Sequence, residues 1–436
     1  MAIALLTPSN VVAVLFGVAI LLLKHFRSSS RALPPGPTPL PIIGNLFDIP
    51  TERPWETYAT WSRRWGDLLS VTLLGQPLII INSLQTAVEL LDKRGAIYSD
   101  RPQLFSADKI GHTKLTPLMT YGSQFREQRR MMAQCIGSRA LVEKYGPLQQ
   151  REVNRFLLRI LRKPEGLSAH IRRLVGAVIL LISHGYQVNP EGHDRFLSLA
   201  DACTDDFANS TLPGSFLVDY IPIMRYIPSW IPGAGWRQKL DRYHQNLLAF
   251  GQEPLDYTKE QMASGTALPS FTSRNLETNP SSIEFEDNLK WTGVALVGGG
   301  SDTTVSSIYT FFLAMTLYPD VQRKAQNEID TVIGNERLPS FQDRDRLPYV
   351  DAVCSEIFRW IAVGPLGVPR RMTEDDTYDG YHLPKGSLLV PNIWKMLHDP
   401  EVYPDPMEFK PERFMASPGR EPELDPHSVA FGFGRR

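Results

Sequence analysis

The sequence predicts a mainly α-helical protein that also carries small β-sheets. Several segments after residue 80 repeat apolar residues at three- and four-residue spacing, which is the period of a helix. Strand-like segments are short and few, at 68–74, 78–82 and 388–390. The 436 residues, 42% hydrophobic and 21% charged, have an ordinary globular composition, and no linker, charge block or repeat divides them. We therefore expect one large domain behind an N-terminal anchor.

Residues 1–30 predict that anchor. A helix over residues 3–23 would be about 31 Å long, just enough for a hydrocarbon core of about 30 Å. Basic residues follow this stretch and none precedes it, so the positive-inside rule keeps the rest of the chain in the cytosol. A cleaved signal peptide is the alternative, and the lack of a basic start and of a small-residue cleavage site argues against it. Residues 31–45 contain the stiff sequence LPPGP and are expected to form a hinge to the body at 46–436.

Charge and cysteine content narrow the class of protein further. A formal net charge of -1 argues against nucleic acid as the main partner. Three cysteines, Cys135, Cys203 and Cys354, are too few and odd in number for a disulfide framework, which favours a reducing compartment. The glycosylation pattern at Asn209 is therefore interpreted as a chance match in a cytosolic body.

Helical patterns run through most of the body. They cover 85–92, 149–160, 172–182 and 319–333, and residues 287–317 predict one very long helix. The segment 172–182 is apolar enough to be largely buried. Residues 213–232 mix prolines, aromatics and apolar residues without a period, which suits equally a lid or membrane-touching surface and an irregular piece of core.

Three consecutive glycines at 298–300 lie in the middle of the longest helical pattern. Each costs about 1 kcal/mol in a helix interior, so the missing side chains must have a use. They leave room for a flat or bulky ligand, with Asp302 and Thr303 beside it. A threonine hydroxyl can bond the carbonyl one turn back and distort the helix locally, so such a pocket could relay a proton. A helix-breaking glycine loop is the alternative, whereas a phosphate-binding loop would need a lysine that is missing here.

Two further groups of charged residues stand out. Glu356 and Arg359 share one helix face, and on a surface such a pair contributes only about 0.2–0.5 kcal/mol. A solvated ion pair is thus the plain interpretation, but Arg413 in the aromatic-flanked segment 409–414 could close a buried three-member network with them. Scattered arginines are each typical surface cations, yet together they could clamp the carboxylates of a bound cofactor. These arginines are Arg126, Arg129, Arg370, Arg371 and Arg436.

These motifs, in this order, resemble the cytochrome P450 superfamily of haem-thiolate monooxygenases, in the style of microsomal fungal enzymes of secondary metabolism. The likeness covers nearly the whole chain. Residues 299–303 match the oxygen-activation motif of the family's long helix, and Glu356 with Arg359 matches its conserved helical pair. Residues 411–414 match the segment that completes the network, and Phe431-x-x-Gly434-x-Arg436 matches the start of the haem-binding loop.

The resemblance implies roles for individual residues. Asp302 and Thr303 would deliver protons during oxygen activation, while Glu356, Arg359 and Arg413 would be structural. The residues expected to bind the haem are the propionate partners Arg129, Arg370 and Arg436, together with Gly299, Gly300, Phe431 and Gly434. No metal ligand is assigned. Phe125 stands where the family often has tryptophan, so a propionate would lose one N–H donor there.

The resemblance also implies cofactors, partners and location. The family binds haem b through a cysteine thiolate and takes electrons from NADPH through a membrane-bound reductase. Its reaction inserts one oxygen atom into an organic substrate, which is expected here to be a lipophilic small molecule. A single-pass protein of the endoplasmic reticulum membrane with a cytosolic catalytic domain is expected.

One departure from the family pattern is severe. The thiolate cysteine would fall two positions beyond Arg436, and its electron donation drives O–O cleavage. We therefore expect a P450 fold that lacks its C-terminal part and is inactive as it stands, because Cys135 and Cys354 are expected to be small buried side chains and Cys203 lies among acids. The sequence is interpreted either as an incomplete version of a longer one, from a gene model or fragment cut at an exon edge, or as a real truncated protein. A non-catalytic membrane protein that competes for the reductase is the alternative function.

Overall fold

A computed structural model describes residues 32–211, 214–278 and 282–434. The anchor predicted at 1–30 lies outside these residues. The strands are β1 (Leu68–Leu73), β2 (Gln76–Ile81), β3 (Arg370–Arg371), β4 (Asp376–Tyr378), β5 (Tyr381–Leu383) and β6 (Leu388–Pro391). The α-helices are α2 (Pro54–Trp65), α3 (Leu84–Ala87), α4 (Gly95–Tyr98), α5 (Phe105–Ile110), α6 (Ser123–Ile136), α7 (Arg139–Glu143), α8 (Gly146–Arg162), α9 (Leu167–His184), α10 (Arg195–Thr211), α11 (Gly235–Ala263), α12 (Phe271–Thr278), α13 (Ile283–Leu317), α14 (Pro319–Val332), α15 (Pro348–Trp360), α16 (Ile393–Leu397) and α17 (His427–Ala430). The π- and 3-10 helices are η1 (Val88–Lys93), η2 (His112–Lys114), η3 (Pro164–Gly166), η4 (Leu217–Asp219), η5 (Pro222–Tyr226), η6 (Phe341–Arg346) and η7 (Pro411–Phe414).

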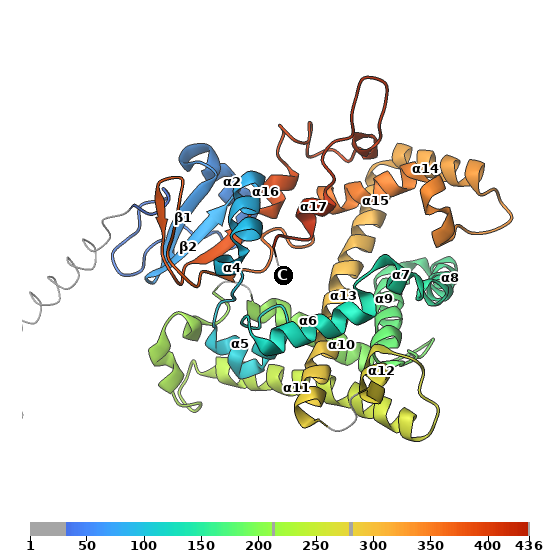
Figure 1. The fold of residues 1–436 in the computed structure, drawn as a ribbon, viewed down its shortest axis with the longest axis horizontal. Coiled ribbons are helices and arrows are strands. Elements are labelled where there is room, and N and C mark those ends of the chain that lie inside the picture. Colours follow the sequence, from blue (N-terminus) through green and yellow to red (C-terminus); the bar gives the residue numbers. More distant parts are fainter. Residues whose placement is uncertain (1–31, 212–213, 279–281, 435–436) are drawn as a thin grey trace, which may run out of the picture.

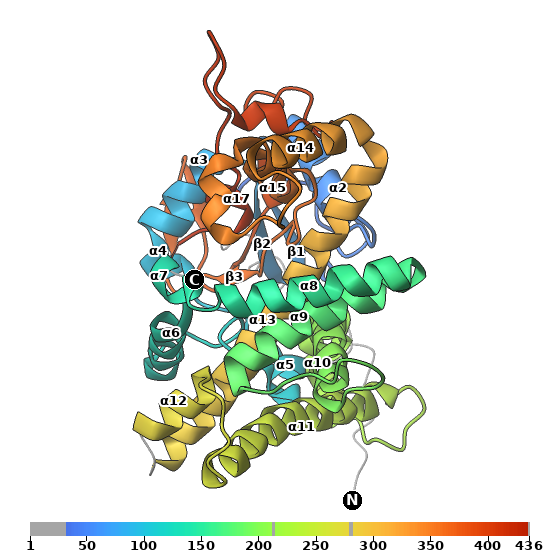
Figure 2. The same ribbon diagram turned by 90° about the vertical axis from the view of Figure 1, so that its right-hand side faces the viewer.

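The sheets gather at one end of the molecule and most helices at the other, with the long helix α13 between them (Figures 1 and 2). The larger sheet has the order β1-β2-β6-β3, in which β2 runs parallel to β6 and the other pairs are antiparallel. This sheet therefore joins residues 68–81 to residues 370–391. The predicted mainly α-helical class with small sheets is confirmed.

Helix α13 is continuous over 35 residues, so the glycines at 298–300 do not break it and the loop interpretation is wrong. The helix begins at Ile283, where the hydroxyl of Ser282 accepts a hydrogen bond from the Phe285 amide at 3.2 Å. It packs against α9, α6, α11 and α15. The middle of the chain's longest helix is thus held on several sides.

The structure agrees closely with the other elements predicted from the sequence. The strand-like segments become β1, β2 and β6, and the helical patterns at 149–160, 172–182 and 319–333 fall in α8, α9 and α14. Residues 85–92 split into α3 and the π-helix η1. One helix in the described part of the chain, Pro164–His184, is long and apolar enough to cross a membrane, but half of its apolar window is buried and it packs on α13 and α8. We therefore assign this helix to the core.

The proline-rich segment predicted as a hinge lies against strand β1. The Ser70 hydroxyl donates a hydrogen bond to the Pro34 carbonyl at 2.6 Å, and the Ser70 amide donates to Pro35 at 3.0 Å. A Cβ added at Gly36 would lie 2.0 Å from the Ser70 carbonyl oxygen, so only glycine allows this close approach. The segment is consequently fixed to the body from Pro34 onward.

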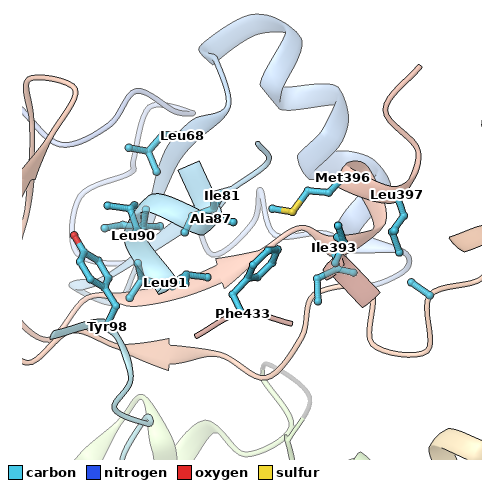
Figure 3. Close-up of a cluster of buried hydrophobic side chains, with 14 of the residues drawn as sticks. Leu68, Ile81, Ala87, Leu90, Leu91, Tyr98, Ile393, Met396, Leu397 and Phe433 are labelled. Carbon is cyan, nitrogen blue, oxygen red and sulfur yellow. The ribbon is translucent and has the colours of Figure 1, made fainter. Parts of the chain in front are cut away.

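A buried apolar cluster joins residues 68–98 to residues 362–433 (Figure 3). Leu91 from η1, Ile393 and Met396 from α16 and Phe433 from the end of the described chain all belong to it. Phe433 points into this cluster in Figure 3. The chain's last described turn is thus anchored by a side chain on the sheet side of the molecule.

The irregular segment predicted at 213–232, either a lid or membrane-touching surface or a piece of core, has both a buried and an exposed part. Phe216 and Val218 are buried in the core that α5, α10, α11 and α13 share. Farther along, Ile223, Tyr226 and Trp230 are almost fully exposed. The segment is therefore core at its start and an exposed apolar surface afterwards.

Candidate functional site

The middle of α13 has an open side at its glycines. A Cβ added at Gly298 or Gly299 would meet no atom within 4 Å, whereas one at Gly300 would lie 2.9 Å from the Ile179 side chain. Gly300 therefore packs closely against Ile179 on α9, and Gly299 borders open space. The Thr303 hydroxyl donates to the Gly299 carbonyl at 2.7 Å, as the sequence predicts. This exposed stretch of a helix that is otherwise held on several sides has room for a flat ligand.

Asp302 lies next to Thr303 and is only partly exposed. Its Oδ1 is 3.6 Å from Nη1 of Arg172 on α9. Burial raises the pKa of the Asp302 carboxyl; the Arg172 charge opposes this rise in pKa and the Asp205 charge adds to it. The Asp302 carboxyl therefore keeps its proton to a higher pH than a solvated aspartate does.

Arg370 on β3 is a buried cation with one hydrogen-bond donor that has no partner. Its side chain is 4% exposed, and Nη2 donates to the Phe433 carbonyl. Nη1 has no hydrogen-bond partner. Burial lowers the pKa of Arg370, with the Asp92 charge acting against this. A buried guanidinium with an unfilled donor suits a carboxylate ligand, so this arginine fits the propionate of a haem.

The last described turn lies directly beside Arg370. Gly434 has a φ of +73°, and a Cβ there would lie 3.0 Å from Nη1 of Arg370 and 2.2 Å from the Leu91 carbonyl oxygen. The Gly434 amide donates to the Asp92 carboxylate. The structure thus brings together Arg370 and Gly434, two site residues that the sequence separates by more than sixty positions.

The neighbouring arginines differ from Arg370 in their partners. Arg371 forms an ion pair with the Asp100 carboxylate, with Nε and Oδ2 3.0 Å apart, so its guanidinium already has a carboxylate partner. Arg101 is buried and donates through Nη1 to the carbonyls of Val368 and Pro369, at 2.6 and 2.9 Å. Arg101 thus binds the two residues that precede Arg370 in the chain, although the sequence did not predict this role. A single arginine before a proline carries no local signal that would have revealed its burial.

The remaining residues predicted to bind the cofactor are either exposed or outside the described part of the chain. Arg129 is exposed on α6, which packs against α13, and no described residue forms an ion pair with it. Arg436 lies outside the described residues. Phe431 is 66% exposed and stacks on His427, with ring centroids 5.8 Å apart, whereas Phe433 is 3% exposed. The role of Arg129 and Phe431 toward the haem stays a prediction.

The predicted three-member network is present and buried. Glu356 accepts from Arg359 at Nε (2.7 Å) and Nη2 (2.8 Å), and from Nε of Arg413 at 3.1 Å. Arg413 also donates to Glu423 at 2.6 Å. Helix α15 and the turn η7 are thereby joined, and the solvated-pair interpretation is wrong.

The three cysteines all lie in the described part of the chain, and none belongs to the apolar cluster that contains Phe433. The Sγ of Cys135 contacts the Tyr145 hydroxyl at 3.2 Å in a buried cluster. Cys203 is buried in the core that contains Phe216. Cys354 is exposed on α15, which corrects the expectation that it is a small buried side chain.

Comparisons with known proteins agree with this arrangement of helices and motifs. Residues 34–436 match the family model described as "Cytochrome P450". The chain is 48% identical to cytochrome P450 monooxygenase 208 of Postia placenta, over 97% of this chain and 83% of that protein. It is 46% identical to cytochrome P450 monooxygenase claR of Ampulloclitocybe clavipes, over 96% and 78% of the two chains. It is 40% identical to an O-methylsterigmatocystin oxidoreductase of Aspergillus flavus, over 94% and 78%.

The mainly α-helical body, with its glycine-lined central helix and buried Glu–Arg–Arg network, therefore falls in a class of monooxygenases. The chain belongs to the cytochrome P450 family, and the relatives it matches are fungal monooxygenases.

Proposed function

We propose that this protein is a haem-dependent monooxygenase that oxidises a lipophilic small molecule in secondary metabolism. The observation that carries the proposal is the buried Arg370, whose Nη1 has no partner. The open side of α13 at Gly299 supports it independently. The similarity to an oxidoreductase named for O-methylsterigmatocystin supports a role in secondary metabolism.

In this function Arg370, Arg129 and Arg436 would hold the haem propionates, and Gly299 would leave room for the ring beside the central helix. Gly300, which was also expected at the cofactor, packs against Ile179 on α9 instead. When bound, haem supplies the iron chemistry that activates oxygen. The protein's own part is to hold and move protons. The Thr303 hydroxyl gives its hydrogen to the Gly299 carbonyl, so its oxygen is free to accept a hydrogen bond from water. One residue away, the raised pKa of the Asp302 carboxyl makes it a better proton acceptor than a solvated aspartate.

The proposal extends to location and partners. The apolar segment at 1–30 anchors the protein in the endoplasmic reticulum membrane with its body in the cytosol. The exposed Ile223, Tyr226 and Trp230 suit contact with a membrane surface, since aromatic side chains favour that interface. Electrons come from NADPH through a reductase on the same membrane.

Porphyrin binding tests the observation on Arg370. We expect the purified chain to bind protoporphyrin IX, because propionate contacts need no iron ligand. Arg370→Gln should weaken this binding about tenfold, since a charge-assisted hydrogen bond is lost. Arg371→Gln is the matched control and should change binding little, because Arg371 is already bound to Asp100. Tryptophan fluorescence quenching measures both. Equal affinities for the two variants, or no binding by the parent chain, would overturn the proposed site.

The type of iron ligation gives a second test. We expect a protein made of these 436 residues alone to lack the carbon monoxide spectrum of a thiolate-ligated haem. The Cys135 thiol is hydrogen-bonded to Tyr145, Cys203 is buried in an apolar core and Cys354 is exposed on α15. None of the three belongs to the apolar cluster that contains Phe433, next to Gly434, so none would be expected to supply a thiolate there. The measurement is the reduced, carbon monoxide-bound absorption spectrum after haem is supplied. A red-shifted Soret band typical of thiolate ligation would contradict this prediction.

A further inference from the structure

One guanidinium lies between two carboxylates from different helices. Nη1 of Arg172, on α9, is 3.4 Å from Oδ1 of Asp201 on α10 and 3.6 Å from Oδ1 of Asp302 on α13. The same nitrogen atom serves both acids. All three side chains are partly exposed, so neither ion pair is locked by complete burial.

The charges around this arginine do not balance. Burial raises the pKa of both Asp201 and Asp302, and Asp205 on α10 adds to each rise. The Asp302 charge also raises the pKa of Asp201. Arg172 on α9 is the cation that opposes these effects at both sites. One positive charge therefore stabilises two carboxylates that repel each other.

We propose that Arg172 is a positioning residue for Asp302 and that Asp201 competes with Asp302 for its guanidinium. When Arg172 leans toward Asp302, the carboxyl next to Thr303 is held charged and fixed. When it leans toward Asp201, Asp302 is free to take up a proton and to turn. The inference rests on the proposed role of Asp302 in proton delivery, which it deepens by naming the residues that control that carboxyl.

Infrared titration of the full chain, purified without haem, tests the competition. The carboxyl band of Asp302 is identified as the band that is lost in Asp302→Asn. We expect Arg172→Gln to raise the midpoint of that band by about one pH unit, because its ion-pair partner is removed. Asp201→Asn should lower the midpoint, because Arg172 is then available to Asp302 alone. Arg173→Gln is the matched control, since Arg173 donates to the carbonyls of Asn189 and Gly192 and should leave the midpoint unchanged.

The double variant separates competition from simple repulsion. If Asp201 acts through Arg172, the shift caused by Asp201→Asn should disappear when Arg172→Gln is already present. Asp205→Asn should give the same downward shift in both backgrounds, because Asp205 acts by direct repulsion. An Asp201→Asn shift of equal size in both backgrounds, or none in either, would overturn the proposal. Arg172→Lys keeps the charge and should restore most of the parent midpoint, even if the glutamine variant folds poorly.

The outcome is independent of the test on Arg370. The titration is performed without a cofactor, so failure of porphyrin binding would remove the proposed function without changing the measured midpoints. Conversely, unchanged midpoints in the variants would refute the role of Arg172 while leaving the haem site standing.

Discussion

Replacement of Glu356 by glutamine is expected to lower the free energy of unfolding by about 3–5 kcal/mol. Glu356 is fully buried and accepts hydrogen bonds from Arg359 and Arg413, which are buried as well, and from the Lys410 amide at 2.8 Å. The amide keeps the shape of the side chain but removes its charge. Two buried guanidinium groups then lose their common counter-ion, and only Arg413 retains another, Glu423.

Chemical denaturation of the purified chain measures this loss. Glu143→Gln is the matched control, because Glu143 pairs with Arg139 four residues away on one helix and in solvent, whereas Glu356 pairs with Arg359 three residues away in the core. An exposed pair of this kind contributes at most about 1 kcal/mol, so the control should be nearly as stable as the parent. Similar stabilities for the two variants would show that burial of the Glu356 network contributes little.

Gly434→Ala is expected to have the second largest effect, a loss of roughly 3 kcal/mol in unfolding free energy. The residue has a φ of +73°, and the new Cβ would lie 2.2 Å from the Leu91 carbonyl oxygen. A backbone carbonyl cannot turn aside as a flexible side chain can, so the turn beside Arg370 must move. Porphyrin binding should weaken in the same variant, because Nη1 of Arg370 is 3.0 Å from that Cβ position.

Gly432→Ala separates the clash from the backbone strain. Gly432 has a φ of +80°, but a Cβ there would meet no atom within 4 Å. This variant should therefore lose only the strain of a left-handed alanine, about 1 kcal/mol. Thermal or chemical unfolding of the two variants side by side gives the comparison. If Gly432→Ala were the more destabilising change, the close approach of Gly434 to Leu91 would not matter.

Local patterns predicted much of the fold. Helix α13 follows from an apolar repeat longer than thirty residues, and the spacing of Glu356 and Arg359 requires only that one helix contain both. The hydroxyl of Thr303 reaches the Gly299 carbonyl because four residues make about one turn. In each of these cases the partners are near neighbours along the chain, so the backbone period alone brings them together.

The individual site residues were harder to predict where burial depends on distant segments. Arg370 and Arg371 are adjacent residues of the same type, yet they have different partners. Arg371 binds the Asp100 carboxylate, whereas Arg370 donates to the Phe433 carbonyl. Phe431 was expected at the cofactor and proves to be largely exposed, while Phe433 is buried. These phenylalanines are two positions apart, with one glycine between them, and only packing against η1 and α16 distinguishes them.

The sequence by itself determined the helical class, the order of the motifs and the identity of the groups that can carry protons and bind acids. Those properties depend on residue type and on periods of a few residues. The tertiary structure alone decided which arginine keeps a free donor, that Gly300 rather than Gly299 packs against α9, and that Arg172 is shared by Asp201 and Asp302. Each of these depends on contacts between helices or strands far apart in the chain, and no local pattern of residues records the neighbours that a side chain meets after folding.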